Sequence, residues 1–375
     1  MKSNARLPLP AAPPVSAEII AQLQRDIADL FTVEDVTLDS PKPGYVRWRG
    51  QLLGDLATHF DDLRGRFERR GFTPRVRREK GQIVLTAMPV VFAETRPNWV
   101  VNLVLFLVTI LSTLYIGASY EPQFSGTELW LGWRYSLSLL LILGAHEMGH
   151  YLAARYHQVP VTLPYFIPLP FSSIGTLGAF IMLKAPVKNR RALLDVGAAG
   201  PLAGLLVALP ILLYGLSISE VGPLPPAGGY LLEGNSLLYL LIKFALFGRI
   251  LPANGIDVTL DSVAWAGWLG LLVTGLNLLP VGQLDGGHAA YVLFGERARR
   301  FFWPVILALI ALALFANALT WGVWVALLFL IGNRHAEPLD DVTPLDGKRR
   351  FVAILTLVIF VLVFTPIPLR VVPPA

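Results

Sequence analysis

Six uncharged and strongly apolar windows constrain the fold of this chain more than any other feature. They lie at 97–120, 135–146, 196–219, 262–284, 301–333 and 351–369. A helix needs about 20 apolar residues to cross the hydrocarbon core of a bilayer. Most of the windows reach that length, and the second does so when it is extended to 156. With 54% hydrophobic and 15% charged residues, the chain is expected to be a polytopic α-helical membrane protein.

The number of spans depends on the window 301–333, which fits either one tilted helix or a hairpin of two short helices around Asn317. Basic residues cluster at 155–191, at 297–300 and at 334–350. If the N-terminal part is cytoplasmic, all three clusters lie on the cytoplasmic side only when this window crosses twice, as the positive-inside rule favours. We therefore expect six to seven transmembrane helices, with seven favoured, in the plasma (inner) membrane of a prokaryote.

The hydrophilic region before the first window is expected to be a small soluble α+β domain at 16–96, preceded by a disordered Pro- and Ala-rich stretch at 1–15. No apolar stretch occurs in the first 30 residues, so no cleavable signal peptide is expected. Hydrophobic periodicity predicts helices and strands, which lie at 16–30 (helix), 45–53 (strand), 56–70 (helix), 72–78 (strand) and 82–91 (strand). The rest divides into a first transmembrane helix with its outer loop at 97–134, a core at 135–295 and C-terminal transmembrane helices at 296–375.

Arginines are concentrated on one side of the expected N-terminal domain. They are Arg64, Arg66, Arg69, Arg70, Arg75, Arg77 and Arg78. One interpretation is a solvated face near anionic lipid headgroups, and the other is a docking site for a regulatory partner or ligand. Although the net charge is +5, most basic residues flank apolar segments, so we do not expect nucleic-acid binding.

An H-E-x-x-H motif, His146-Glu147-Met148-Gly149-His150, lies at the end of the second window. Positions i and i+4 share one face of a helix, so both imidazoles can reach one ion. Glu147 lies beside that face, where it can act on water. Polar residues at membrane depth are costly unless they have a function. The alternative is a polar seam that bonds two helices together.

A catalytic zinc usually has three protein ligands, so the motif lacks one. The chain has no cysteine, which leaves His, Asp or Glu. Asp285 follows the fourth window, after Pro280 and before Gly286 and Gly287. A broken helix at membrane depth is tolerated where it lines a protein-buried site, and an aspartate at such a break can bind zinc. The alternative for Asp285 is a helix cap or a salt bridge.

Two motifs in this order resemble the signature of the site-2 protease family of intramembrane metalloproteases: H-E-x-x-H at 146–150 and N-x-x-P-x-x-x-L-D-G at 277–286. The glycine-rich run 197–204 is similar to a small-residue motif of the same family. The resemblance covers roughly 135–295. It implies a zinc endopeptidase that cleaves transmembrane protein substrates within the lipid bilayer.

The same resemblance implies roles for individual residues. His146, His150 and Asp285 match the zinc ligands, Glu147 matches the general base, and Asn277 matches an asparagine that contacts the substrate backbone or the oxyanion. Interhelical bonding is the alternative for Asn277. Residues 40–96 and 159–194 look like the branch that includes the plastid ethylene-dependent gravitropism-deficient and yellow-green proteins and their bacterial relatives. The loop 220–261 is too short for the PDZ domain that some members of the family carry there.

A substrate helix must unwind before its peptide bonds can be cut. The proline-rich segment 158–192 is not expected to be a spanning helix. Within it, 173–183 is expected to form a strand or hairpin beside the membrane, whose edge can pair with an unwound substrate.

Several polar or small residues near the motifs have ordinary structural interpretations. His157 is expected to be solvated, and His288 to have a structural or supporting role. Asp195 is expected to act in helix-start electrostatics beside Arg190 and Arg191. Close helix packing is expected at Gly197, Gly200 and Gly204.

Two other function classes remain open from the sequence. In a metal transporter, the buried histidines and aspartate would form an ion path, and Glu147→Gln would be tolerated. In a non-catalytic membrane scaffold, the N-terminal domain would hold clients whether or not zinc is bound. The intact Glu147 favours the protease over both.

Overall fold

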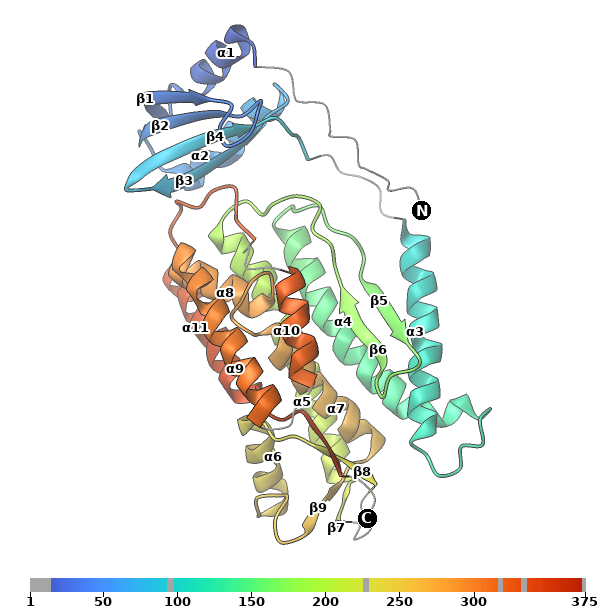
Figure 1. The fold of residues 1–375 in the computed structure, drawn as a ribbon. Helices are drawn as coiled ribbons and strands as arrows, with labels where there is room; N and C mark the ends of the chain where they lie inside the picture. The colour runs from blue at the N-terminus through green and yellow to red at the C-terminus, as the bar shows by residue number, and fades with distance from the viewer. Residues whose placement is uncertain (1–14, 93–97, 225–228, 316–319, 332–335, 373–375) are drawn as a thin grey trace, which may run out of the picture. The chain divides into compact units, whose positions relative to one another are not determined.

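The computed structural model describes residues 15–92, 98–224, 229–315, 320–331 and 336–372 (Figure 1). The chain forms two compact units. Unit 1 consists of Met1–Thr95 with two short segments from later in the chain, Ala185–Arg190 and Glu337–Pro344. Unit 2 contains the remaining residues. Apart from Val15, the stretch expected to be disordered lies outside the described residues.

Unit 1 packs two helices against one antiparallel sheet. The helices are α1 (Ala17–Ile27) and α2 (Leu56–Glu68), and the strands in spatial order are β1 (Phe31–Leu38), β2 (Val46–Leu52), β4 (Gln82–Met88) and β3 (Thr73–Glu79). Ser16 caps α1 by accepting from the N–H of Ile19. Lys80 and Gly81, both with positive φ, form the turn between β3 and β4. Strand β1 is the element of this sheet that the sequence interpretation missed.

The core of unit 1 explains why these elements come together. Leu23 of α1 and Phe60 and Phe67 of α2 are fully buried against Trp48 of β2 and Val76 of β3. The rings of Trp48 and Phe67 meet edge to face with their centroids 6.2 Å apart. Burial of a large apolar side chain contributes about 1.5–3 kcal/mol relative to its exposure, so this layer provides the main stabilisation of unit 1.

The segment Glu337–Pro344 pairs with the open edge of β3. The N–H of Val76 donates to the carbonyl of Leu339 at 2.7 Å, and the N–H of Asp341 donates to the carbonyl of Val76 at 2.9 Å. The other side of this segment bonds to Ala185–Arg190, because the N–H of Asp340 donates to the carbonyl of Lys188 at 2.8 Å. Two chain segments from far along the sequence therefore extend the sheet.

The arginine-rich side of unit 1 carries less free charge than the sequence interpretation assumed. Five of its seven arginines form ion pairs, which are Arg64 with Glu68, Arg66 with Asp29 and Asp62, Arg70 with Asp26, and Arg75 and Arg77 with Glu337. The acidic partners lie on or directly after the two helices and in the segment paired with β3. Much of the positive charge is therefore compensated within the unit.

Unit 2 is dominated by apolar helices. Four helical stretches among the described residues are long and apolar enough to cross a membrane: Trp99–Ser119, Leu129–Tyr156, Arg190–Ser217 and Asp285–Phe315. They correspond to α3 (Trp99–Ser119), to the 3-10 helix η1 (Leu129–Gly132) with α4 (Trp133–Tyr156), to α5 (Arg190–Ser217), and to α8 (Asp285–Phe294) with η2 (Gly295–Phe301) and α9 (Phe302–Phe315). The mostly helical membrane architecture expected from composition is confirmed.

Shorter helices complete unit 2. They are α6 (Leu237–Phe247), α7 (Ser262–Asn277), α10 (Thr320–Ile331) and α11 (Gly347–Val363). The window 301–333 thus contains two helices, α9 and α10. They meet through the rings of Phe302 and Phe329, whose centroids are 5.8 Å apart. Asn317, where the sequence interpretation placed the turn, lies outside the described residues.

Short strands connect the helices of unit 2. They form three two-stranded antiparallel pairs: β5 (Tyr165–Leu169) with β6 (Gly175–Phe180), β7 (Glu220–Pro223) with β9 (Ile256–Thr259), and β8 (Tyr230–Glu233) with β10 (Leu369–Val372). The hairpin β5–β6 agrees with the strand expected at 173–183. Strand β5 lies along α3, and β6 lies beside α4 (Figure 1).

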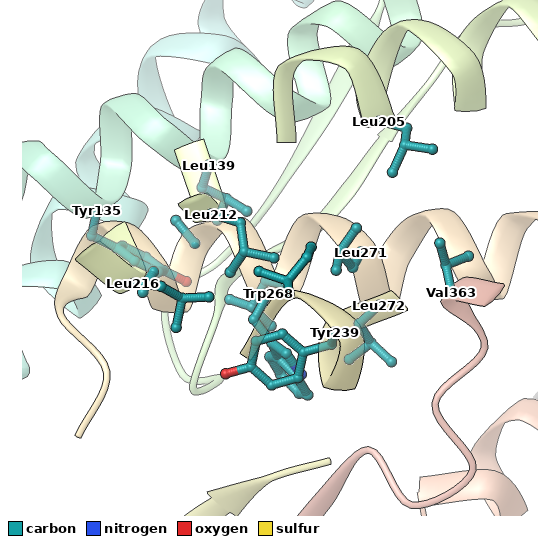
Figure 2. Packing of buried hydrophobic residues seen from close by; sticks show 14 of the residues in the cluster. Tyr135, Leu139, Leu205, Leu212, Leu216, Tyr239, Trp268, Leu271, Leu272 and Val363 are labelled. Carbon is teal, nitrogen blue, oxygen red and sulfur yellow. The ribbon is translucent and has the colours of Figure 1, made fainter. Parts of the chain in front are cut away.

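The main core of unit 2 lies where α4, α5, α6 and α7 meet (Figure 2). Leu139 of α4, Leu212 of α5, Tyr239 of α6 and Trp268 of α7 are almost completely buried there. Helix α4 contains the motif at 146–150 and α7 ends at Asn277, the first residue of the second motif, so this apolar packing holds the two motif-bearing helices in register.

Helix α6 was missed because Lys243 interrupts an otherwise apolar stretch. Lys243 is fully buried, and its Nζ lies 3.6 Å from carboxylate oxygens of both Glu233 and Asp257. The search for uncharged windows therefore passed over this helix. Its lysine can be buried because Glu233 of β8 and Asp257 of β9 compensate the charge.

Candidate metal centre

The three expected metal ligands come from two separate helices of unit 2. His146 and His150 lie on α4, one turn apart and both buried. Asp285 is the first residue of α8, immediately after the break that begins at the end of α7. Its carboxylate therefore lies at a helix N-terminus, where the helix dipole stabilises negative charge.

The ligand atoms form a compact triangle. The Nε2 atoms of His146 and His150 are 3.1 Å apart, and Oδ2 of Asp285 lies 3.5 Å and 3.3 Å from them respectively. Tetrahedral zinc with bonds of about 2.0–2.2 Å places its ligand atoms about 3.4 Å apart. Three donor atoms at these mutual distances can share one cation. The triangle thus fits one zinc ion with a coordination position left open.

A backbone carbonyl orients His150. Its Nδ1 lies 2.7 Å from the carbonyl oxygen of Val196 on α5. A carbonyl can only accept, so Nδ1 carries the proton, and Nε2 keeps its lone pair for a metal. Val196 could not be singled out from the sequence, because a backbone carbonyl can come from any residue type.

Glycines of α5 make room for three histidine rings. A Cβ on Gly197 would lie 2.9 Å from Cβ of His288, one on Gly200 would lie 2.1 Å from Nε2 of His150, and one on Gly204 would lie 3.1 Å from Cβ of His146. The close helix packing expected for these glycines is confirmed. Its specific effect is to let α5 approach the imidazoles of the metal centre.

We predict that Gly200→Ala disrupts this centre. The added methyl group overlaps the ring of His150, and overpacking of this kind typically costs about 1–3 kcal/mol. Because the ring can relieve the overlap by turning away, zinc affinity should fall while the fold persists. Competition with a chelating dye measures this affinity, and circular dichroism monitors the fold.

The matched control for this prediction is Gly144→Ala on α4. A Cβ at Gly144 meets nothing within 4 Å, and alanine favours a helix over glycine. Equal zinc affinity in Gly200→Ala and Gly144→Ala would contradict the packing argument.

Glu147 and Asn277 lie beside the ligand triangle. Both residues line the same cavity of about 230 Å³ as the three ligands, and β6 contributes Ala179 and Phe180 to its wall. Glu147 is buried. The Nδ2 atom of Asn277 lies 3.3 Å from Nε2 of His146. The structure therefore brings together all five residues singled out from the two motifs.

The other histidines of the described chain do not belong to the ligand triangle. His288 lines the cavity without belonging to the triangle. His59 is on α2 of unit 1, and His335 lies outside the described residues. His157 is half-buried and bonds through Nε2 to Asp195 at 2.8 Å. The expectation of a solvated His157 was therefore wrong, because the tertiary fold brings α5 against the end of α4.

Asp195 also differs from its expected role. Its partners are His157 and Arg349, while Arg190 pairs with Asp341 at 2.8 Å. The sequence could suggest only the nearby arginines, since Arg349 is 154 residues away.

The donor set agrees with the chemistry of zinc. Two imidazole nitrogens and one carboxylate oxygen are the ligand types of open, catalytic zinc sites. His146, His150 and Asp285 are also the group that the described part of the chain offers for holding a metal ion.

Comparison with known proteins identifies a family for the region that contains the metal centre. Residues 134–320 match the model of peptidase family M50. The chain is 31% identical over 360 residues to "Probable zinc metalloprotease EGY2, chloroplastic" of Arabidopsis thaliana, covering 89% of this chain and 62% of that protein. It is 33% identical over 237 residues to "Probable zinc metalloprotease EGY1, chloroplastic" of the same plant, covering 61% and 42% respectively.

The chain therefore spans less than two thirds of the length of these relatives. No solved structure matches the chain. The matched region 134–320 includes both motifs and every residue of the ligand triangle. The order of these motifs and the family match together place the chain in peptidase family M50, the family of site-2 proteases that its sequence resembles.

Proposed function

We propose that this chain is an intramembrane zinc endopeptidase that hydrolyses peptide bonds in or near transmembrane segments of other membrane proteins. One observation carries the proposal: three metal-ligand atoms converge in a cavity among helices that are apolar enough to span a bilayer. Glu147 lines the same cavity. A peptide bond brought there meets both a metal site and a carboxylate base. The names of the M50 relatives as zinc metalloproteases support the same activity.

The residues of the centre have distinct proposed roles. His146, His150 and Asp285 hold zinc, which supplies a Lewis acid for amide hydrolysis when bound. Glu147 takes a proton from the attacking water and then passes it to the leaving amine. Asn277 donates a hydrogen bond to the oxyanion that develops on the scissile carbonyl. These roles require the cavity wall to hold the substrate in an extended form.

Strand β6 is suited to that task. It pairs with β5 on one side, and Ala179 and Phe180 at its end line the cavity beside Glu147. Leu177 and Phe180 are exposed, so the hairpin offers an apolar surface to a substrate at membrane depth. An unwound substrate adding as a strand would satisfy its own backbone groups by pairing with protein.

We predict that Ala179→Pro lowers cleavage without releasing zinc. Proline removes one backbone donor from the strand and fixes φ. Loss of a single backbone hydrogen bond, about 0.5–1.5 kcal/mol, corresponds to a fall of about two- to thirteenfold in kcat/KM. Thr176→Pro is expected to act in the same direction, but Thr176 is buried and bonds the carbonyl of Ile167, so Ala179 gives the cleaner test.

The control is Ala179→Gly, which keeps the backbone N–H. Cleavage of a model transmembrane substrate and zinc content are measured for both variants. Unchanged cleavage by Ala179→Pro would rule out strand addition at this edge.

The experiment that tests the proposed function combines two measurements on the purified wild type in detergent. We expect about one zinc per chain and cleavage of a model transmembrane substrate, lost with a chelator and restored by zinc. A folded wild type that binds no zinc would refute the ligand assignment. Zinc flux in proteoliposomes without any cleavage would instead support a metal transporter.

We further propose a topology of seven crossings. Residues 16–96, as a soluble α+β domain, and the active-site end of α4 lie on the cytoplasmic side, where basic residues are enriched. Helices α9 and α10, of 14 and 12 residues, form a hairpin. Each is shorter than the roughly 20 residues of an ordinary span, so mutual packing must shield their ends. Single-cysteine labelling tests this topology in a chain that has no cysteine of its own.

The proposed location is the plasma membrane of a prokaryote. The relatives named above are chloroplastic by name, which supports a membrane location without favouring this one. Membrane fractionation of the source cells distinguishes the two locations.

Unit 1 is the proposed docking site for a regulatory partner. Of the seven arginines on its arginine-rich side, Arg69 and Arg78 have no acidic partner among the described residues and are candidates for that contact.

A further inference from the structure

Asp195 joins three helices of unit 2 at one carboxylate. It lies in the second turn of α5 and is half-buried. Its Oδ2 accepts from Nε2 of His157 at 2.8 Å. Both of its oxygens bind the guanidinium of Arg349, at 2.9 Å and 3.0 Å from Nε, and Nη2 adds a contact of 2.6 Å. Charge-assisted bonds of this kind are among the strongest and most directional in proteins.

Each partner of Asp195 connects to a different part of the metal centre. His157 caps the C-terminus of α4, two turns after the ligand His150. Asp195 itself precedes Val196, whose carbonyl fixes the ring of His150 at 2.7 Å. The carboxylate thus ties the end of α4 to the α5 residue that orients one of its zinc ligands.

Arg349 provides the connection to the third ligand. It lies in the first turn of α11, where Nη1 also bonds Oδ2 of Asp346 at 2.7 Å. Asp346 caps the same helix through the N–H of Arg349. Helix α11 packs against α8, which begins with Asp285. The guanidinium of Arg349 is therefore held by Asp195 of α5 and by Asp346 at the start of α11, the helix that packs against α8.

We propose that Asp195 is a positioning residue for the metal centre, acting with Arg349 and His157 to hold α4, α5 and α11 in the register that brings the three ligands together. This inference rests on the proposed zinc site. Partners that orient ligands typically affect metal affinity or activity by about 10- to 100-fold. Asp195 acts through the carbonyl of Val196 and through α11 and does not touch the metal itself.

The contacts among Asp195, His157 and Arg349 should contribute little to the free energy of unfolding, and their main effect should be on the relative placement of α4, α5 and α11. These three side chains are between 18% and 30% exposed, and ion pairs near the surface stabilise proteins by about 0–1 kcal/mol. The fold of unit 2 depends instead on the apolar core around Leu212 and Trp268. A substitution at Asp195 or Arg349 should therefore alter ligand placement while leaving the unit folded.

The test compares Asp195→Asn and Arg349→Gln with the wild type. Asp195→Asn keeps the shape of the side chain and removes its charge, whereas Arg349→Gln removes the guanidinium that binds Asp195. We expect zinc affinity, measured by competition with a chelating dye, to fall by about 10- to 100-fold. At saturating zinc we expect kcat to fall with little change in KM, and the thermal midpoint to stay near that of the wild type.

Three further variants sharpen the test. Arg349→Lys keeps the charge without the bidentate geometry, so it should restore only part of the affinity lost in Arg349→Gln. The double variant should lose less affinity than the two single losses combined, because both substitutions remove the contact between Asp195 and Arg349. Arg350→Gln is the matched control, since Arg350 is exposed on the next position of α11, and its zinc affinity should equal that of the wild type.

Wild-type zinc affinity in Asp195→Asn, or equal losses in Arg349→Gln and Arg350→Gln, would overturn the positioning role. Zinc loss that appears only together with unfolding would also overturn it. These outcomes differ from failure of the proposed function, in which the wild type itself binds no zinc or binds zinc without cleaving. In the second of those cases the affinity measurements still decide the role of Asp195.

Discussion

Glu147→Gln is expected to abolish cleavage while leaving one zinc bound per chain. Glutamine has nearly the same shape as glutamate but cannot take a proton, and general-base catalysis contributes about 10²–10⁴-fold to a rate. The substitution removes no ligand of the triangle formed by His146, His150 and Asp285. Loss of kcat with retained zinc would therefore assign the base separately from the metal site.

The measurement is single-turnover cleavage of a model transmembrane substrate in detergent, with metal analysis of the same preparation. Glu121→Gln, in the connection between α3 and η1, is a control for removing one carboxylate elsewhere in unit 2 and should cleave like the wild type. Undiminished cleavage by Glu147→Gln would eliminate Glu147 as the base and would reopen the metal-transport interpretation.

Asp285→Asn is expected to lose both zinc and activity. The amide keeps an oxygen near Nε2 of His146 and His150 but removes the negative charge that compensates a divalent ion. Loss of a direct ligand should weaken zinc binding by more than the ~10- to 100-fold effect of a supporting residue. High zinc concentrations should restore cleavage only partly, because the remaining ligands place the ion less rigidly.

Competition with a chelating dye measures the affinity, and Asp285→Glu tests whether charge alone is sufficient. The control is Glu296→Gln in η2, at an exposed ion pair with Arg299 at 3.1 Å, where no effect on zinc is expected. Wild-type zinc affinity in Asp285→Asn would show that the third ligand lies elsewhere. The same result would undercut the triangle on which the proposed function depends.

The sequence predicted the regular elements wherever one physical signal dominated. Apolar windows located α3, α4, α5 and α7, because a span of about 20 apolar residues is a strong signal. It failed where two signals competed. Strand β1 carries Glu34 and Asp35 in its middle and has an irregular register between Val33 and Asp35, which breaks the alternation expected of a strand. Helix α5 starts at Arg190, before its uncharged window, and its charged residues have partners far along the chain: Arg190 pairs with Asp341, and Asp195 pairs with Arg349.

The five motif residues could be found from the sequence because their spacing encodes chemistry. His146 and His150 share a helix face by the geometry of the helix itself. Pro280 and the following glycines mark the break that presents Asp285. These relations are local, so they are visible without a tertiary structure.

What surrounds the ligands was decided by the tertiary structure alone. The carbonyl of Val196, the space left by Gly200 and the bond between Asp195 and Arg349 depend on which helices become neighbours. A backbone carbonyl has no sequence signature, and an ion pair across 154 positions is one of many possible pairings. The sequence thus identified the candidate ligands and the apolar helices, whereas packing of α4 against α5 placed the carbonyl that orients His150.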